Sequence, residues 1–556
     1  MNKNIVFIII DALRFDVIQK NTKSSLTPTL NLLIDKGYLK KIITNGQVTK
    51  FVVPSIFTQT YPLDKDGYNY GIKNRDKSFV EILKENGFKC LMLEGHDIDG
   101  PFGNCERGFD EVYRFYDKRL LLEGFIKKKL LYDIKKWRSG KYSKKKIIHI
   151  FQKELGDLLS YIQKNKNRVN QGFFEAFMGP YTKYEIMNIE KERELLSNYP
   201  MEVITKVEQI SPYFYFDYLG KKKYKISFKI RNKFFSIFKK IQNLTNSLLN
   251  IQISFIPSRP RIASQCRYFF NQAINLIKGI DHKWFMYIHF MDLHDHSIAS
   301  RPIQFLSKFL NLPTVLKYRK KQSRENYQSL RSLSYDLSVF QVDKELSKFI
   351  SKLKKINKFD STVFVIFGDH GDGWDKKRDK DLRKNFGFKT FYEHINIPLI
   401  IYPKFKNKIE KGLHDSMSIS ASLLELLKIN QHKSFKGTSI FKKGKKLIVT
   451  ENCGRGNADI KNRDIFFTLT NDKCKLMLRL KEEKLILENF YDLKQDPKEI
   501  KNLINCIDKK KSVEINEMLS FFFQERKELL YIRNFKNIPN LKSKNVIIKT
   551  IYENKK

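Results

Sequence analysis

The stretch Val363-Phe-Val-Ile-Phe-Gly-Asp-His-Gly371 joins an apolar run to an acid and an imidazole flanked by glycines. A continuous apolar run of this length is typical of a parallel strand buried on both faces. In open α/β sheets, ligands bind beyond the carboxyl ends of the strands, and both polar side chains here are ligands of divalent cations. A second apolar run, Ile5-Val-Phe-Ile-Ile-Ile10, ends at Asp11. The two strands predict one shared metal site, with a turn-capping role as the alternative for Asp11.

The rest of the chain alternates strand and helix patterns, which predicts an α/β fold with a mostly parallel sheet flanked by helices. Thr27-Pro28 supplies the start of a helix that Gly37 ends, and a second helix is expected over 79–86. Further strands are expected at 89–93, 284–290, 362–367 and 398–402, and a further helix at 416–428.

We expect four segments. Residues 1–117 form the first part of the α/β core, 118–280 a basic, mainly helical insertion, and 281–450 the second part of the core. Residues 451–556 form a C-terminal subdomain with antiparallel strands. The insertion is interpreted either as a basic surface for a substrate or a membrane, or as a solvated helical lid with a lysine-rich exterior.

The net charge is +45, with 105 Lys and Arg against 60 Asp and Glu. Such an excess favours an anionic partner such as a glycan or a lipid headgroup, unless it reflects only a codon bias toward lysine. The six cysteines show no C-x-x-C pairing, which predicts free thiols in a reducing compartment. No signal peptide and no apolar run long enough to span a membrane are seen. We therefore expect a cytoplasmic protein, in peripheral contact with a membrane at most.

A hydroxyl side chain at a helix N-terminus is well placed to act as a nucleophile on an anion, because the helix end stabilises negative charge. Residues 46–62 contain such a turn into a helix. A threonine or serine alcohol needs activation, for which metal coordination is one route. The residues alone leave four candidates, which are Thr49, Ser55, Thr58 and Thr60.

At these motifs the chain resembles the sulfatase family of the alkaline-phosphatase superfamily. Asp11-Ala-Leu-Arg-Phe-Asp16 is similar to the family's D-x-L-R-x-D, and Gly368-Asp-His-Gly371 to its S/G-D-H-G. Phe490-Tyr-Asp-Leu-Lys-Gln-Asp-Pro-Lys-Glu-Ile-Lys-Asn-Leu503 is similar to its closing Y-D-L-x-x-D-P-x-E-x-x-N-L. The segment Thr49–Pro62 resembles members with a threonine nucleophile, and the register of Pro54-Ser-Ile-Phe-Thr58 puts that nucleophile at Thr49. The matches span nearly the whole chain except the insertion.

The resemblance implies roles for particular side chains. One divalent metal ion would be held by Asp11, Thr49, Asp369 and His370. Thr49, His294 and Lys50 would carry the catalysis, His294 at the leaving group and Lys50 offsetting charge on the transferred group. Substrate-binding residues would be His289, Asp292, Lys389 and His394.

The chain also departs from the family. Sulfatases usually carry C-x-P-S-R or S-x-P-S-R, whose first residue becomes formylglycine, whereas this chain has Thr49-Lys-Phe-Val-Val53. Threonine cannot become formylglycine, which favours a covalent phospho-threonine route. The paired acids after the first strand are reduced to Asp11-Ala12, which favours Mn²⁺, Zn²⁺ or Mg²⁺ over Ca²⁺.

We therefore expect a metal-dependent hydrolase or transferase that acts on phosphate or sulfate esters through a covalent Thr49 intermediate. Its substrate would be an anionic small molecule or a glycan- or lipid-linked ester, and nucleic acid is not expected. Two alternatives stay open. One is a true sulfatase, and the other is a non-catalytic protein that binds an anionic polymer through the basic insertion.

Overall fold

The computed structural model describes most of the 556-residue chain. The described residues are 3–18, 25–65, 67–68, 71–95, 104–114, 130–164, 183–209, 237, 240, 244, 266–294, 302–321, 330–373, 390–454, 460, 464–481 and 484–533.

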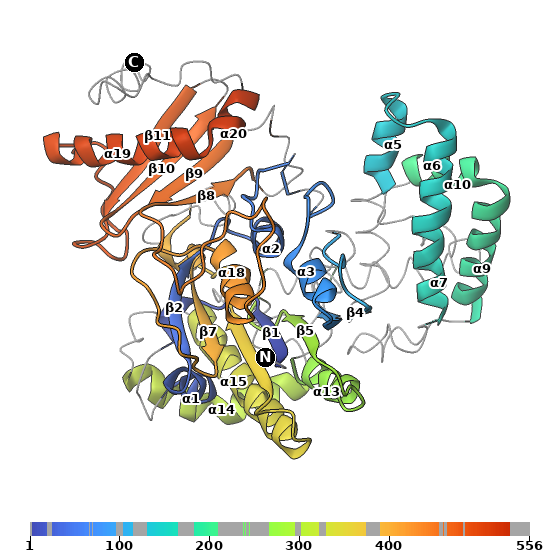
Figure 1. Ribbon diagram of the computed structural model, residues 1–556, viewed down its shortest axis with the longest axis horizontal. Helices are drawn as coiled ribbons and strands as arrows, with labels where there is room; N and C mark the ends of the chain where they lie inside the picture. Colours follow the sequence, from blue (N-terminus) through green and yellow to red (C-terminus); the bar gives the residue numbers. More distant parts are fainter. Residues whose placement is uncertain are drawn as a thin grey trace.

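A seven-stranded mixed sheet has the strand order β2-β7-β6-β1-β5-β3-β4. Helices such as α13, α15 and α18 lie around it (Figure 1). The strands β6, β1, β5, β3 and β4 run parallel, while β7 is antiparallel to both of its neighbours. Their bounds are β1 Asn4–Ile10, β2 Tyr38–Ile43, β3 Lys89–Glu94, β4 Glu111–Arg114, β5 Trp284–Phe290, β6 Thr362–Phe367 and β7 Asn396–Tyr402. This is the α/β fold with a mostly parallel sheet that the sequence predicts.

Helices cover both faces of this sheet. Alternate residues of β1 enter two different cores, with Val6 and Ile8 on one face and Ile5 and Phe7 on the other. The first face packs against α1 Pro28–Asp35, α13 Cys266–Ile277, α14 Pro302–Lys321 and α15 Leu330–Lys355. The second packs against α2 Thr49–Thr58, α3 Phe79–Glu85 and α18 Met417–Leu426. Because both faces are buried, the strands need apolar residues at every position, which explains the continuous runs in the sequence.

The expected elements of the core lie close to the observed ones. The strands predicted at 284–290 and 362–367 are β5 and β6, and the strand predicted at 398–402 begins two residues earlier, at Asn396. The single-turn helices η1 Phe15–Val17 and α17 Tyr392–Ile395 lie in loops after β1 and before β7.

A four-stranded antiparallel sheet forms the C-terminal part, in the order β11-β10-β9-β8. Its elements are β8 Ile448–Asn452, β9 Ile465–Thr470, β10 Cys474–Lys481, β11 Lys484–Asp492, α19 Lys509–Glu525 and α20 Lys527–Ile532. Its core includes Phe51 from α2, so it packs directly against the α/β core.

A buried ion pair joins this sheet to the loop that precedes β7. Lys475 of β10 pairs with Glu499, and both side chains are almost fully buried. Glu499 Oε2 also accepts a hydrogen bond of 3.1 Å from the backbone N–H of Tyr392. Lys475 Nζ donates to the carbonyl oxygen of Thr390 at 3.3 Å. The C-terminal sheet therefore fixes residues 390–392.

The described part of the insertion is helical, with a small core of its own that contains Ile134, Ile147, Phe151 and Ile204. Its elements are α5 Leu131–Arg138, α6 Lys144–Ile150, the π-helical turn Phe151–Leu155, α7 Gly156–Lys164, α9 Lys183–Asn198 and α10 Pro200–Gln209. The four segment boundaries stay a prediction.

Among the described residues, no helix combines the length and the apolar character that crossing a bilayer requires.

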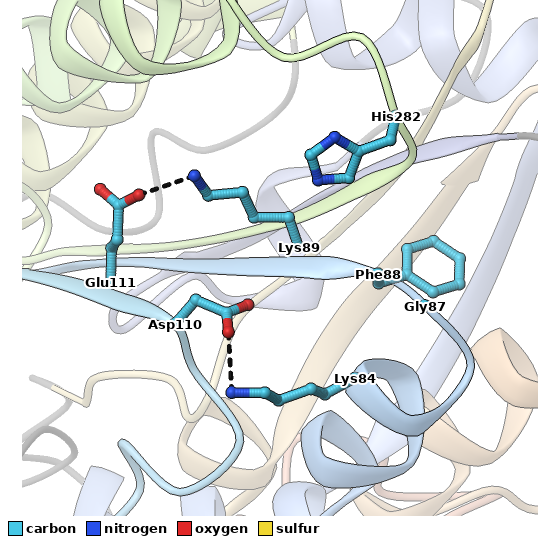
Figure 2. Close-up of a pocket in the computed structure, with 7 residues that line it drawn as sticks. All are labelled: Lys84, Gly87, Phe88, Lys89, Asp110, Glu111 and His282. Carbon is cyan, nitrogen blue, oxygen red and sulfur yellow. Dashed lines mark ion pairs between the residues drawn. The ribbon is translucent and has the colours of Figure 1, made fainter.

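A surface pocket lies at the amino ends of β3 and β4 (Figure 2). Its charged groups are paired with each other, Lys84 with Asp110 at 2.7 Å and Lys89 with Glu111 at 2.9 Å. Because ligands of parallel sheets bind at the carboxyl ends of the strands, this pocket is not the expected site.

Replacing Lys475 by alanine tests the link between the two sheets. The change leaves the buried carboxylate of Glu499 without its cation, which costs about 3–5 kcal/mol of unfolding free energy. Urea denaturation followed by circular dichroism measures the loss. As the matched control, Lys77→Ala removes the solvent-exposed pair between Lys77 and Glu85 and should cost less than about 1 kcal/mol. Equal losses in the two variants would show that the buried pair does not join the sheets.

Candidate metal centre and active site

Four neighbouring strands end at the same edge of the central sheet, and each brings a polar side chain there. From β3 to β6 these are Glu94, His289, Asp11 and Asp369. The register pairs Glu94 with His289 across β3 and β5. The backbone N–H of Asp11 bonds to Phe290 at the end of β5, with an N···O distance of 3.3 Å. Parallel pairing thus sets the row of polar groups, because strands that run in one direction all end at one edge.

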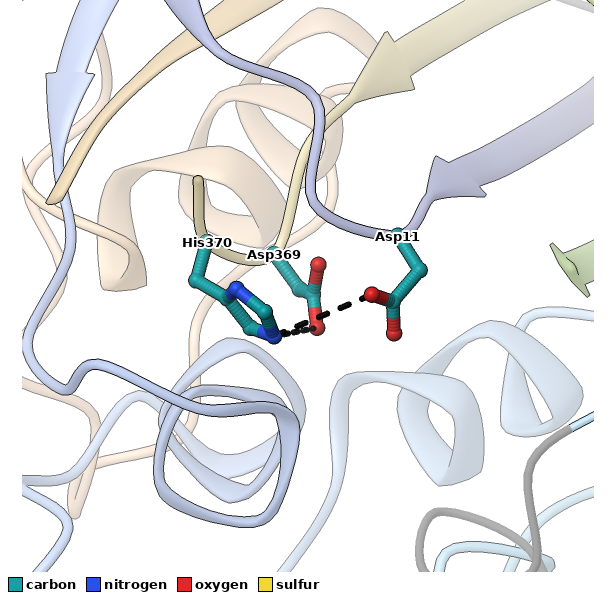
Figure 3. A group of neighbouring side chains, drawn as sticks. All are labelled: Asp11, Asp369 and His370. Atoms are coloured by element: carbon teal, nitrogen blue, oxygen red, sulfur yellow. Dashed lines mark ion pairs between the residues drawn. The ribbon is translucent and has the colours of Figure 1, made fainter. Parts of the chain in front are cut away.

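Asp11, Asp369 and His370 form a buried cluster at this edge (Figure 3). One ligand atom from each residue lies within 4.8 Å of the other two. His370 Nε2 is 3.5 Å from Asp369 Oδ2 and 3.8 Å from Asp11 Oδ1. The two strands that the sequence singled out therefore do bring their side chains together.

The hydrogen bonds of the cluster fit a divalent cation. Asp11 Oδ1 and Asp369 Oδ2 are buried and accept no hydrogen bond from any described residue. His370 Nδ1 lies 2.7 Å from the carbonyl oxygen of Gly371, so this nitrogen carries the proton and the lone pair of Nε2 faces the carboxylates. Two carboxylate oxygens and an imidazole lone pair thus converge on one point, where a cation would offset the buried negative charge.

Thr49 is the first residue of α2, and its side chain faces the cluster. Its Oγ1 is 3.2 Å from Asp11 Oδ2 and 3.4 Å from His370 Nε2. The other hydroxyl groups of this segment bond locally: Ser55 and Thr58 donate to carbonyl groups one turn back in α2, and Thr58 also contacts Thr60. The position at a helix N-terminus adds a favourable field for an anion beside Thr49.

His289 lies between two buried carboxylates. Its Nε2 is 3.4 Å from Asp11 Oδ2, and its Nδ1 is 3.3 Å from Glu94 Oε1. Burial by itself would raise the pKa of Asp11, but the contact with His289 and the charge of His294 outweigh it. The pKa of Asp11 is therefore held well below its usual range, and its carboxylate is ionised.

Sequence reasoning missed Glu94. The signal was present, because Glu94-Gly95 ends an apolar strand in the same way that Asp369 follows β6. Gly95 also permits a close approach, since a Cβ there would meet the carbonyl oxygen of His289 at 3.0 Å.

Two buried residues position the loops that carry the cluster. Tyr335 of α15 donates to the carbonyl oxygen of Ala12 at 2.7 Å and accepts from the N–H of Arg14 at 3.1 Å. Arg14 in turn donates to the carbonyl oxygen of Asp372 at 3.0 Å, and so joins the loop after β1 to the loop after β6.

The remaining predicted residues lie at varying distances from the cluster. The charge of His294 lowers the pKa of Asp11. The backbone carbonyl oxygen of His394 accepts a hydrogen bond from the N–H of Gly371 at 2.8 Å. Asp292 accepts from the N–H of Cys266, at the start of α13, at 3.0 Å. Lys50 Nζ lies over the ring of Tyr68, 5.1 Å from its centroid. Lys389 lies outside the described residues.

Comparisons with known proteins agree with this fold. The family model described as Sulfatase matches residues 242–429. An arylsulfatase of Clostridium perfringens is 24% identical over 197 residues, which are 33% of this chain and 37% of that protein. This match thus spans little more than a third of the relative.

Two solved structures share the fold over nearly the whole chain. A 2-O GAG sulfatase superposes with a TM-score of 0.51 at 12% identity, over 95% of this chain and 93% of the other. The protein Ps i-CgsB, in complex with k-i-k-neocarrahexaose, superposes with a TM-score of 0.50 at 13% identity, over 96% and 94%. The mixed α/β sheet and the small antiparallel sheet thus belong to a known fold.

Asp369→Asn tests the cluster as a cation site. The change keeps the shape of the side chain but removes a buried negative charge, so Mn²⁺ affinity measured by isothermal titration calorimetry should fall at least about 100-fold. Asp372→Asn is the matched control, because Asp372 pairs with Arg331 at 2.9 Å instead of facing the cluster. Its affinity should stay within about threefold of the unmodified protein. Equal affinities in all three proteins would contradict the assignment.

Proposed function

Since the chain carries a sulfatase-family domain, we propose that it is a metal-dependent enzyme that hydrolyses or transfers phosphate esters through a covalent bond to Thr49. The observation that carries this proposal is the position of the Thr49 hydroxyl. It lies at the N-terminus of α2 and contacts both Asp11 and His370. A nucleophile needs a group nearby that accepts its proton and a field that favours the incoming anion, and this position offers both.

The side chains around Thr49 favour phosphate over sulfate. Threonine has no route to the formylglycine that sulfatases use. Val53, which stands where those enzymes carry arginine, is fully buried in an apolar core with Val52 and Ile56. This position therefore supplies no cation for a sulfate group, and direct attack by the Thr49 oxygen on phosphorus is the simpler reaction.

Each residue then has a defined part in the reaction. Asp11, Asp369 and His370 would hold the cation, together with Thr49. A divalent cation bound there supplies Lewis-acid stabilisation of negative charge on the transferred group. The bond from Thr49 Oγ1 to phosphorus forms as the bond from phosphorus to the leaving oxygen breaks. The hydroxyl proton of Thr49 passes to Asp11 Oδ2, 3.2 Å away, and His294 gives the leaving oxygen a proton. Lys50 would offset charge on the phosphoryl group. Water or an acceptor alcohol then releases the phosphate from Thr49.

The proposed substrate is an ester linked to a glycan or a lipid headgroup, or a smaller anionic ester. The net charge of +45 supports an anionic substrate of this kind. A sulfatase that uses threonine directly and a non-catalytic anion-binding protein are the two other functions that the tests below must separate.

Thr49→Ala is expected to lower turnover of p-nitrophenyl phosphate with added Mn²⁺ by roughly 10³-fold or more, because it removes the attacking oxygen. Intact-mass analysis of the unmodified enzyme should show a phosphate-sized adduct that the variant lacks. Ser55→Ala is the matched control in the same helix and should keep activity within about threefold.

Paired phosphate, phosphonate and sulfate esters separate the alternatives. Release of sulfate alone would make the protein a threonine sulfatase. Turnover that survives Thr49→Ala would contradict the nucleophile assignment, and binding of Mn²⁺ without turnover of any ester would favour a binding protein.

We also propose that the insertion contacts anionic membranes through Lys144, Lys145 and Lys146, which are exposed at the start of α6. Changing all three to glutamate should weaken binding to vesicles of phosphatidylserine and phosphatidylcholine by roughly 100-fold in a sedimentation assay, at about 1 kcal/mol per lysine. The matched control has the same charge change at Lys404, Lys406 and Lys408, which are exposed after β7. Equal losses in the two variants would mean that only net charge matters.

A further inference from the structure

We propose that Glu94 and His289 form a buried support that orients Asp11 for the cation. In this support, neither residue touches the cation or the substrate. The inference rests on the proposed function, because it concerns the same metal site, and it gives His289 a positioning role instead of a substrate-binding one.

The geometry places the three side chains in one line along the edge of the sheet. Glu94 Oε1 is 3.3 Å from His289 Nδ1, and His289 Nε2 is 3.4 Å from Asp11 Oδ2. All three side chains are fully buried, so no solvent competes for these contacts. The β3–β5 register sets Glu94 directly beside His289, which fixes the order of the contacts through the backbone.

The contacts divide the two oxygens of Asp11 between two tasks. Oδ2 faces His289 and accepts the hydroxyl of Thr49 at 3.2 Å. Oδ1 accepts no hydrogen bond from the described residues and points to the side of His370 and Asp369. A carboxylate whose one oxygen is tied by protein donors presents the other to a cation in a fixed direction, which is how outer partners tune metal ligands.

Glu94 is needed because an imidazole beside a single carboxylate can rotate or shift. Ionised carboxylates only accept hydrogen bonds, so Glu94 and Asp11 together favour the ring that carries a proton on both nitrogens, with Nδ1–H pointing to Glu94 and Nε2–H to Asp11. Glu94 Oε1, 3.3 Å from Nδ1, supplies a contact that holds the ring on that side. Such carboxylate–histidine supports typically change metal affinity by about 10–100-fold.

Glu94→Gln in the full-length protein tests the support. The change keeps the size of the side chain and removes its charge. Mn²⁺ alone is the probe, added to metal-free protein in isothermal titration calorimetry. We expect the Kd for Mn²⁺ to rise about 10–100-fold at unchanged stoichiometry. Glu111→Gln is the matched control, a carboxylate at the amino end of the adjacent strand β4, paired with Lys89 and distant from the cluster. It should leave the Kd within about threefold.

His289→Gln and the double variant complete the test. If the two residues act as one unit, the double variant should bind Mn²⁺ no more weakly than the worse single variant, because coupled residues are not additive. A merely structural role would lower the melting temperature of the metal-free protein and leave the Kd unchanged.

The outcomes separate this inference from the proposed reaction. Equal Kd values for Glu94→Gln and Glu111→Gln, with Asp369→Asn still deficient, would overturn the support and keep the metal site. Absence of Mn²⁺ binding by the unmodified protein would overturn both. A raised Kd for Glu94→Gln in a protein that turns over no ester would establish the support and leave the proposed reaction without its evidence.

Discussion

Negative charge buried at one edge of the central sheet is the constraint on which this protein depends. Glu94, Asp11 and Asp369 all lie there without access to water. Three carboxylates so close together are stable only with positive or hydrogen-donating partners. His289 contacts both Glu94 and Asp11, and the N–H of Ala12 donates a hydrogen bond to Asp369 Oδ1 at 3.1 Å. The remaining oxygens, Asp11 Oδ1 and Asp369 Oδ2, accept no hydrogen bond from the described residues and belong to the cluster with His370, which is an arrangement that attracts a cation. Folding and metal binding are therefore expected to support each other.

Buried contacts around this edge of the sheet hold the loops that carry the carboxylates. Tyr335 and Arg14 hold the loops after β1 and β6, and the C-terminal sheet holds residues 390–392 through Lys475 and Glu499. Side chains from distant parts of the chain thus limit the movement of a few ligand atoms. The described part of the insertion adds a separate small helical core.

Much of the core was predictable because buried parallel strands leave a strong pattern. The apolar runs before Asp11 and Asp369 predicted both the strands and their meeting at one edge. Glu94 was missed because a single acid after a strand is common, and only the strand order places it next to His289. Asp292 was assigned to substrate binding and Lys50 to catalysis, and both roles stay predictions. Their observed contacts, to the start of α13 and to the ring of Tyr68, depend on tertiary packing that no local pattern records.

The pairing of β1 has a consequence for how the protein is made. Residues 4–10 are made before their neighbours in the sheet, which are residues 284–290 and 362–367. This apolar strand therefore waits for segments far along the chain before it can pair, and pairing over such separations is slow. During synthesis the strand is exposed to wrong partners, so nascent chains are expected to depend on chaperones that shield it. Meanwhile the insertion, whose contacts are local, can fold ahead of the sheet that it interrupts.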